Sequence, residues 1–260
     1  MEQKDITDLG DQLYNALVTK NPVDPITSRF PEITIEDAYK IQQRMLSHRL
    51  KNGEKVIGKK IGVTSKAVMN MLGVGQPDFG YMLDGMAYQE GQAVDISNLI
   101  QPKAEGEIAF VLKKNLMGPG ITAADVLAAT EGVMVCFEIV DSRIKDWKIK
   151  IQDTVADNAS CGGFVLGSQL VDIRDIDLIN CGMVLEKNGE VAVTGAGAAT
   201  MGSPVNAMVW LANTLGRLGI SLNAGEVVLS GALGAMVPVK AGDQLRVTIG
   251  GIGSCSIRFE

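Results

Sequence analysis

Apolar residues recur at helical spacing through the first fifty positions of the chain. A first stripe begins at Ile6 and is closed by Pro22. A second stripe covers residues 35–50 and follows a Thr34-x-x-Asp37 pattern that is typical of a capping box. The spacing therefore predicts two amphipathic helices and a helical N-terminal segment.

Short apolar runs typical of strands replace the helical spacing from residue 56 onward. The predicted strands cover residues 56–63, 93–94, 104–112, 133–140, 163–166, 183–193, 227–230, 244–249 and 254–259. Asn188-Gly189 lies between two alternating arms and indicates a tight hairpin within one of these runs. Helices are predicted after Thr64, after Thr122 and from Ser203-Pro204 onward.

The order of these elements bounds the fold class. Strands and helices do not alternate regularly, and no Gly-x-Gly-x-x-Gly follows a predicted strand, which argues against a dinucleotide-binding fold. The 30 glycines gather at strand ends and turns rather than in a linker. The sequence thus predicts an α+β protein, with a small helical N-terminal part over residues 1–75 and a mainly β body over residues 76–260.

Composition narrows the classes of partner. The chain has 260 residues, of which 46% are hydrophobic, with a formal net charge of −6. No run of Lys or Arg offers a nucleic-acid surface, and the longest apolar stretches fall short of the ~20 residues that a membrane helix needs. The first residues are acidic and polar, without the basic and apolar regions of a signal peptide. We therefore expect a cytoplasmic protein with no nucleic acid or membrane partner.

Histidine and cysteine usage limits the possible chemistry. The only histidine, His48, falls in the second predicted helix, where a surface position is expected, so a mechanism that needs a histidine base is disfavoured. The four cysteines are scattered without a CxxC pair, which is typical of reduced core thiols. The chemistry must then be carried by carboxylates, lysines, hydroxyls or a metal held by oxygen.

Three glutamates are candidates for holding such a metal. Glu105 and Glu107 lie two apart on a predicted strand, so both side chains share one face. Glu138 stands alone in an apolar run, where a charge is costly to bury unless it is paired or coordinated. Clustered carboxylates select hard divalent ions such as Mg²⁺ or Mn²⁺. The alternative is that Glu105 and Glu107 mark only the solvent face of a strand.

Other polar positions are compatible with a site but have plain structural alternatives. Lys60 lies between Gly58 and Gly62, where a backbone can approach a ligand closely, or it protects an edge strand. Asp78 follows Gln76-Pro77 and is either a turn former or an acid/base. The 153–160 segment is rich in hydrogen-bonding groups and is also explained by the capping of a short helix.

At these residues the chain resembles a known enzyme family. The segments Gly58-Lys-Lys-Ile-Gly-Val-Thr-Ser-Lys66, Gln76-Pro-Asp-Phe-Gly80 and Ala156-Asp-Asn-Ala-Ser-Cys161 are similar to those of the 2-hydroxypenta-2,4-dienoate (2-oxopent-4-enoate) hydratases of aromatic meta-cleavage catabolism. These hydratases belong to the fumarylacetoacetate-hydrolase-like superfamily, and the resemblance covers nearly the whole chain. It implies a mixed β-roll body under the helical N-terminal part, and a homo-oligomer.

The resemblance also implies roles for particular residues. Glu105, Glu107 and Glu138 would hold one Mg²⁺ or Mn²⁺, which would act as a Lewis acid toward a small 2-oxo acid substrate. Lys60, Ser160 and Ser230 would contact the substrate, and the catalytic set would comprise Lys60, Asp78 and Ser160. The expected reaction is hydration of the dienoate to 4-hydroxy-2-oxopentanoate.

Three other functions compete with this expectation. The first is a 4-oxalocrotonate (2-oxo-3-hexenedioate) decarboxylase, which shares the metal logic and must also accept a second carboxylate. The second is a carbon–carbon bond hydrolase, which would depend on His48 as its only histidine. The third is a non-catalytic scaffold that associates with the decarboxylase, against which the intact glutamates argue.

Overall fold

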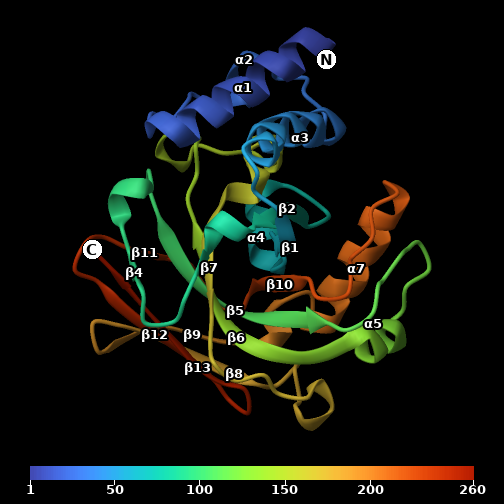
Figure 1. Ribbon diagram of the computed structural model, residues 1–260, viewed down its shortest axis with the longest axis vertical. Coiled ribbons are helices and arrows are strands. Elements are labelled where there is room, and N and C mark those ends of the chain that lie inside the picture. The colour runs from blue at the N-terminus through green and yellow to red at the C-terminus, as the bar shows by residue number, and fades with distance from the viewer.

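The helical N-terminal part forms a layer at one end of the molecule (Figure 1). In the computed structural model, which describes residues 1–260, this layer contains α1 (Gln3–Thr19), α2 (Ile26–Arg29) and α3 (Ile35–Lys51). The predicted capping box is confirmed, because Thr34 accepts a hydrogen bond from the Asp37 amide and the Asp37 carboxylate accepts one from the Thr34 amide.

The helical layer is packed on the body through a core of its own. Its buried apolar stripe includes Leu9, Leu13 and Ile41, and the same cluster contains Ile144 and Val155 from the body. The N-terminal helices are therefore fixed to the rest of the chain by burial of apolar surface, which is the dominant favourable term in folding.

The larger sheet has eight strands in the order β2-β1-β10-β5-β6-β7-β3, with β11 paired to β5. These strands are β1 (Val56–Gly62), β2 (Asp78–Leu83), β3 (Ala87–Tyr88), β5 (Lys103–Leu112), β6 (Thr130–Val140), β7 (Cys161–Leu166), β10 (Val227–Ala232) and β11 (Val237–Pro238). β1 pairs with both β2 and β10, so the sheet takes a strand from within residues 1–75. The division of the chain at residue 75 stays a prediction.

A second sheet of five strands packs against the first, in the order β4-β13-β12-β8-β9. Its strands are β4 (Ala93–Val94), β8 (Gly182–Lys187), β9 (Glu190–Ala196), β12 (Gln244–Ile249) and β13 (Gly253–Phe259). The predicted hairpin is confirmed: Asn188 and Gly189 join β8 to β9 with φ of +54° and +86°, as a tight two-residue turn requires. Phe110 and Phe137 of the first sheet and Val247 of the second belong to one core of 37 buried residues.

Four further helices complete the body: α4 (Lys66–Leu72), α5 (Ala123–Ala129), α6 (Ile151–Ala156) and α7 (Pro204–Arg217). α7 begins as predicted, with Ser203 as its cap and Pro204 in the first turn, and it lies along one side of the larger sheet (Figure 1). No helix has the length and apolar character needed to cross a bilayer. The predicted α+β class, with N-terminal helices on curled mixed sheets, is confirmed.

Two structural alternatives raised by the sequence are wrong. Asp78 is the first residue of β2 and is 1% exposed, so it is not a turn former. Lys60 lies on β1, which is paired on both sides, so it does not protect a sheet edge.

Candidate metal and catalytic site

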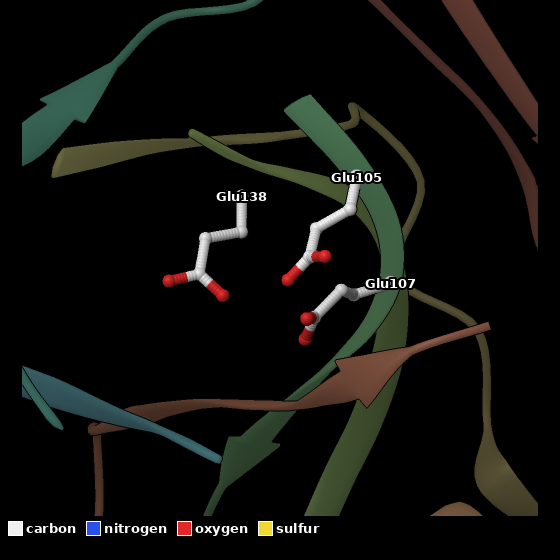
Figure 2. Close-up of side chains that lie close together, drawn as sticks. All are labelled: Glu105, Glu107 and Glu138. Carbon is white, nitrogen blue, oxygen red and sulfur yellow. The ribbon is translucent and has the colours of Figure 1, made fainter. Parts of the chain in front are cut away.

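The three glutamates converge from two neighbouring strands. Glu105 and Glu107 lie on β5, and Glu138 lies directly opposite Glu105 on β6. One carboxylate oxygen from each residue lies within 4.8 Å of the others, and Figure 2 shows the three carboxyl groups turned toward one another. Glu107 and Glu138 are fully buried and Glu105 is partly buried, so the solvent-face interpretation of the Glu105/Glu107 pair is wrong.

Gly106 explains how this spacing is kept on a tightly packed strand. Its missing side chain would point to the opposite face of β5, where a Cβ would lie 2.7 Å from both the Met183 sulfur and Val247 Cγ2. Since real Cβ atoms do not approach this closely, any residue other than glycine between the two glutamates would have to displace the Met183 and Val247 side chains of the second sheet.

The carboxylate cluster fits a divalent cation. Glu107 Oε1 and both carboxylate oxygens of Glu138 are buried without a hydrogen bond. Burial, reinforced by the neighbouring carboxylates, raises the pKa of Glu105 to about 7 and that of Glu107 well above its ordinary range. Buried polar groups normally have a partner, and carboxylate oxygens are the ligands that hard cations select. A metal ion at this position would satisfy the orphaned oxygens and the repulsion together.

The backbone of β10 holds one of the three glutamates in place. The Gly231 amide donates a hydrogen bond of 2.8 Å to Glu107 Oε2 at an irregularity between Leu229 and Ala232. Gly231 has a φ of +109°, which is a conformation that glycine adopts without strain. The neighbouring Ser230 hydroxyl donates to the Ile108 carbonyl at 2.9 Å, so its proton is used inside the sheet and its contact with substrate stays a prediction.

Lys60 extends from β1 to the same cluster. Its ammonium lies 3.1 Å from Glu138 Oε1 and donates a hydrogen bond of 2.9 Å to the Ala159 carbonyl. The contact with Glu138 has the distance of an ion pair but not the angles of a hydrogen bond, which is why Glu138 Oε1 remains unsatisfied. Burial alone lowers the pKa of Lys60, but Glu138 and Asp78 outweigh it and raise the pKa, so the ammonium stays charged.

Asp78 faces Lys60 with one carboxylate oxygen held and the other free. Oδ2 accepts a hydrogen bond from the Thr154 hydroxyl, whereas Oδ1 is buried without a partner. Burial raises the pKa of Asp78, against the opposing effects of Lys60 and Thr154. A Cβ on Gly62 would lie 2.3 Å from Oδ1 and 3.2 Å from the Lys60 ammonium, so these two charged groups occupy the space that Gly62 leaves open.

Ser160 lies at the end of a short segment that follows α6. Its hydroxyl donates to Asp157 Oδ2 at 3.3 Å, and the Lys60 contact with Ala159 places this segment beside the cluster. The structure thus brings Lys60, Asp78 and the Ala159–Ser160 backbone to the glutamates.

His48 takes no part in the cluster. It lies on α3, where its Nε2 is 2.6 Å from Asp11 Oδ1 and its ring stacks on Tyr14. All four cysteines are free and buried, as the sequence predicted.

The sequence did not single out Thr154, Gly231 or Gly62 as functional positions. Thr154 gave no separate signal, because hydroxyls and carboxylates near a helix start are explained by capping. Asp153 does cap α6, accepting from the Lys150 amide. Gly62 carried a signal, since a glycine inside a strand often marks the close approach of another group.

Comparisons with known proteins agree with this geometry. Residues 73–260 match the fumarylacetoacetate hydrolase C-terminal family. A 2-hydroxypent-2,4-dienoate hydratase of Pseudomonas putida is 67% identical over 222 residues, which cover 85% of this chain and 100% of that protein. A 2-hydroxyhexa-2,4-dienoate hydratase of Comamonas testosteroni is 58% identical, with 96% of each chain covered.

Among solved structures, a 4-oxalocrotonate decarboxylase from Pseudomonas putida G7, complexed with magnesium and adipate, has a TM-score of 0.97 and 38% identity. That similarity covers 100% of this chain and 99% of the other. A second structure of that decarboxylase, complexed with calcium and acetate, has a TM-score of 0.95. Both structures pair a divalent ion with a small carboxylic acid.

Proposed function

The chain belongs to the fumarylacetoacetate hydrolase C-terminal family, and on that premise we propose that it is a hydro-lyase acting on a small 2-hydroxydienoate. The substrate we propose is 2-hydroxypenta-2,4-dienoate, which reacts through its 2-oxo tautomer. The product is 4-hydroxy-2-oxopentanoate. The observation that carries the proposal is the buried cluster of unsatisfied carboxylate oxygens beside a charged lysine and a half-free aspartate.

We assign the metal to Glu105, Glu107 and Glu138, and expect Mg²⁺ or Mn²⁺. When bound, the ion would supply Lewis acidity toward the 2-oxo acid end of the substrate. Lys60 adds a fixed positive charge on the same side, and it is held there by Glu138 and the Ala159 carbonyl. Preorganised charge of this kind favours the negative charge that develops on a 2-oxo acid during enolisation.

Asp78 is the residue that we assign to proton transfer. Ketonisation moves the enol proton of the substrate to C5, and hydration places the hydroxyl of water at C4 and a proton at C3, so the sum is one added water. Each transfer needs a group that can hold a proton close to the carbon chain. Asp78 Oδ1 is free for this, while Thr154 fixes Oδ2. Ser160 is proposed as a contact for substrate or water.

The decarboxylase remains the alternative, because its overall structure is nearly superimposable on this chain. The hydratases are the more similar in sequence, at 67% and 58% identity against 38%. The carbon–carbon hydrolase is disfavoured because the only histidine, His48, lies on α3 with Asp11 as its partner and takes no part in the glutamate cluster. A homo-oligomer and an association with a decarboxylase stay predictions from the family resemblance.

The proposal is tested by mixing metal-stripped protein with freshly generated 2-hydroxypenta-2,4-dienoate, with and without Mg²⁺ or Mn²⁺. Metal-dependent loss of the dienol absorbance, with 4-hydroxy-2-oxopentanoate identified by NMR, is the expected result. Absence of turnover with either metal, together with release of CO₂ from 2-oxo-3-hexenedioate, would assign the decarboxylase instead.

Glu105→Gln is expected to lower kcat by about 100-fold or more, because a metal ligand worth several kcal/mol of transition-state stabilisation is lost. The fold should persist, since Gln fills the same space without the buried charge. Activity and thermal unfolding of the metal-stripped variant are measured together. Full activity without added metal would contradict the scheme.

A further inference from the structure

The segment that carries the Ala159 carbonyl has an unusual backbone. Asn158, Ala159 and Ser160 have φ of +53°, +50° and +53°, three left-handed residues in succession without a glycine. L-residues avoid this conformation because their Cβ crowds the neighbouring carbonyl, so a run of three persists only where the surrounding structure imposes it. We call residues 158–160 the left-handed turn.

Arg143 holds both ends of the left-handed turn. Its guanidinium donates to the Asp157 carbonyl on one side of the turn and to the Cys161 carbonyl, at 3.1 Å, on the other. A third hydrogen bond goes to the Asp141 carbonyl, at 2.5 Å. The side chain is 1% exposed, and the rigid fork of donors in arginine suits it to bridge several fixed acceptors at once.

Asp157 binds Arg143 and compensates its buried positive charge, and we call these two residues the clamp. Its Oδ1 accepts from Arg143 Nε at 2.5 Å, and its Oδ2 accepts from the Arg143 amide at 3.0 Å. Oδ2 also accepts from the hydroxyls of Ser142 and Ser160, so both carboxylate oxygens are fully used. Arg143 and Asp157 therefore form a closed unit, whereas the glutamate cluster has orphaned oxygens.

The first two residues of the left-handed turn are tied to the strands that carry Asp78 and Lys60. The Asn158 side chain accepts from the Tyr81 amide and donates to the Tyr81 carbonyl on β2. The Ala159 carbonyl accepts from Lys60. A Cβ on Gly80 would lie 2.4 Å from the Asn158 carbonyl, so β2 leaves room for the turn to approach.

We propose that Arg143 and Asp157 are positioning residues, which force the left-handed turn so that the Ala159 carbonyl aims the Lys60 ammonium at the glutamate cluster. The proposal rests on the proposed function for its kinetic readout. It assigns no contact with substrate to Arg143, which acts through Lys60 alone.

Arg143→Lys is the principal test, because lysine keeps the charge opposite Asp157 but cannot bridge the two ends of the turn. We expect kcat to fall about 100-fold, as misplacing a reacting group by about 1 Å does. In a Lys60→Met background the same change should leave the remaining rate unaltered, because residues that act as one unit are not additive. An equal loss in both backgrounds would overturn the proposal.

Ala159→Gly tests the turn without disturbing the clamp. Glycine adopts the left-handed conformation without the crowding that a Cβ causes, and the Arg143–Asp157 contacts are unchanged, so kcat should be kept and thermal stability should be retained or raised. Lys20→Gly is the matched control: Lys20 has a φ of +60° at the end of α1, and its side chain makes no hydrogen bond or ion pair. This control should keep full kcat. A loss of thermal stability in Ala159→Gly that Lys20→Gly does not show would count against the left-handed geometry of the turn.

Amide hydrogen exchange provides a readout that does not depend on substrate. The Ser160 and Cys161 amides donate within the segment, to the carbonyls of Asp157 and Asn158. Arg143→Lys should accelerate their exchange at least tenfold and leave the β8–β9 hairpin unchanged. If the wild type does not hydrate the dienoate, the proposed function is wrong, and the role of Arg143 and Asp157 is then tested by hydrogen exchange alone. Unchanged exchange would overturn it.

Discussion

Gly62 matters to the site because it has no side chain. It lies opposite Asp78 in the pairing of β1 with β2, and the free oxygen of Asp78 occupies the position where a methyl group would point. The φ of Gly62 is not in the left-handed region, so its backbone would accept alanine and any effect of that change is steric.

Gly62→Ala should therefore lower kcat by about 10- to 100-fold by displacing Asp78 Oδ1 from its present position. The cost in the free energy of unfolding is expected to be only about 1–3 kcal/mol, which is typical of overpacking by one methyl group. The measurements are steady-state kinetics and urea denaturation.

Gly182→Ala is the matched control for this substitution. Gly182 begins β8, and a Cβ there would meet nothing within 4 Å. Its kcat should equal that of the wild type. An unaltered kcat in Gly62→Ala would show that the position of Asp78 Oδ1 does not limit the reaction.

At the scale of elements, the sequence predicted local features such as turns and caps, but it did not predict which distant strands would pair. Period-two spacing placed Glu105 and Glu107 on one face, and the Asn188-Gly189 hairpin and the cap at Thr34 were readable from a few adjacent residues. β1 lies between β2, which was not among the predicted strands, and β10, which is distant in sequence, so nothing local showed that Lys60 would be buried. The left-handed turn contains no glycine and carried no signal.

Gln42 shows how a helix of the N-terminal layer reaches the site. Its side-chain amide, buried on α3, donates to the Phe79 carbonyl and to the Val155 carbonyl, each at 3.0 Å. Phe79 follows Asp78 and Val155 follows Thr154, so one amide fixes both sides of the Asp78–Thr154 hydrogen bond.

Gln42→Met should lower the free energy of unfolding by about 2 kcal/mol, because it removes the donor shared by two buried carbonyls while keeping the side-chain volume. It should also lower kcat, since Asp78 and Thr154 lose their common anchor. Gln43→Met, on the exposed side of the same helix, is the control and should stay within about 0.5 kcal/mol of the wild type. Equal stability of the two variants would argue against this anchor.

Over the whole molecule, the glutamates lie on the face of the larger sheet that points away from the second sheet. The face of β5 opposite the glutamates packs against the second sheet, as the close approach of Met183 and Val247 to Gly106 shows. The family resemblance implied that these glutamates are metal ligands, which stays a prediction, but the sequence could not show how far their carboxylates are desolvated. Burial turns three ordinary carboxylates into a cluster that needs a cation or protons to be stable.

Metal-stripped protein should therefore lose stability as the pH rises from about 5 to about 7.5. Burial raises the pKa of Glu105 from 4.5 to about 7, so in this window the folded state holds a proton that the unfolded chain has released. Raised folded pKa values contribute stability at low pH that is lost as the pH passes the folded value. The thermal midpoint is measured across this range without metal.

Added Mg²⁺ should reverse that loss, because the ion replaces the protons in the cluster. At about 100 times its Kd the ion contributes about 2.7 kcal/mol, or roughly 5–10 °C in Tm for a chain of this size. The gain should be larger at about pH 7.5 than at about pH 5, where protons compete for the same oxygens. Glu107→Gln should be less sensitive to pH without metal and should lose the gain from Mg²⁺, since it removes a buried charge and a ligand together. A gain from Mg²⁺ that persists undiminished in Glu107→Gln would show that Glu107 does not hold the ion.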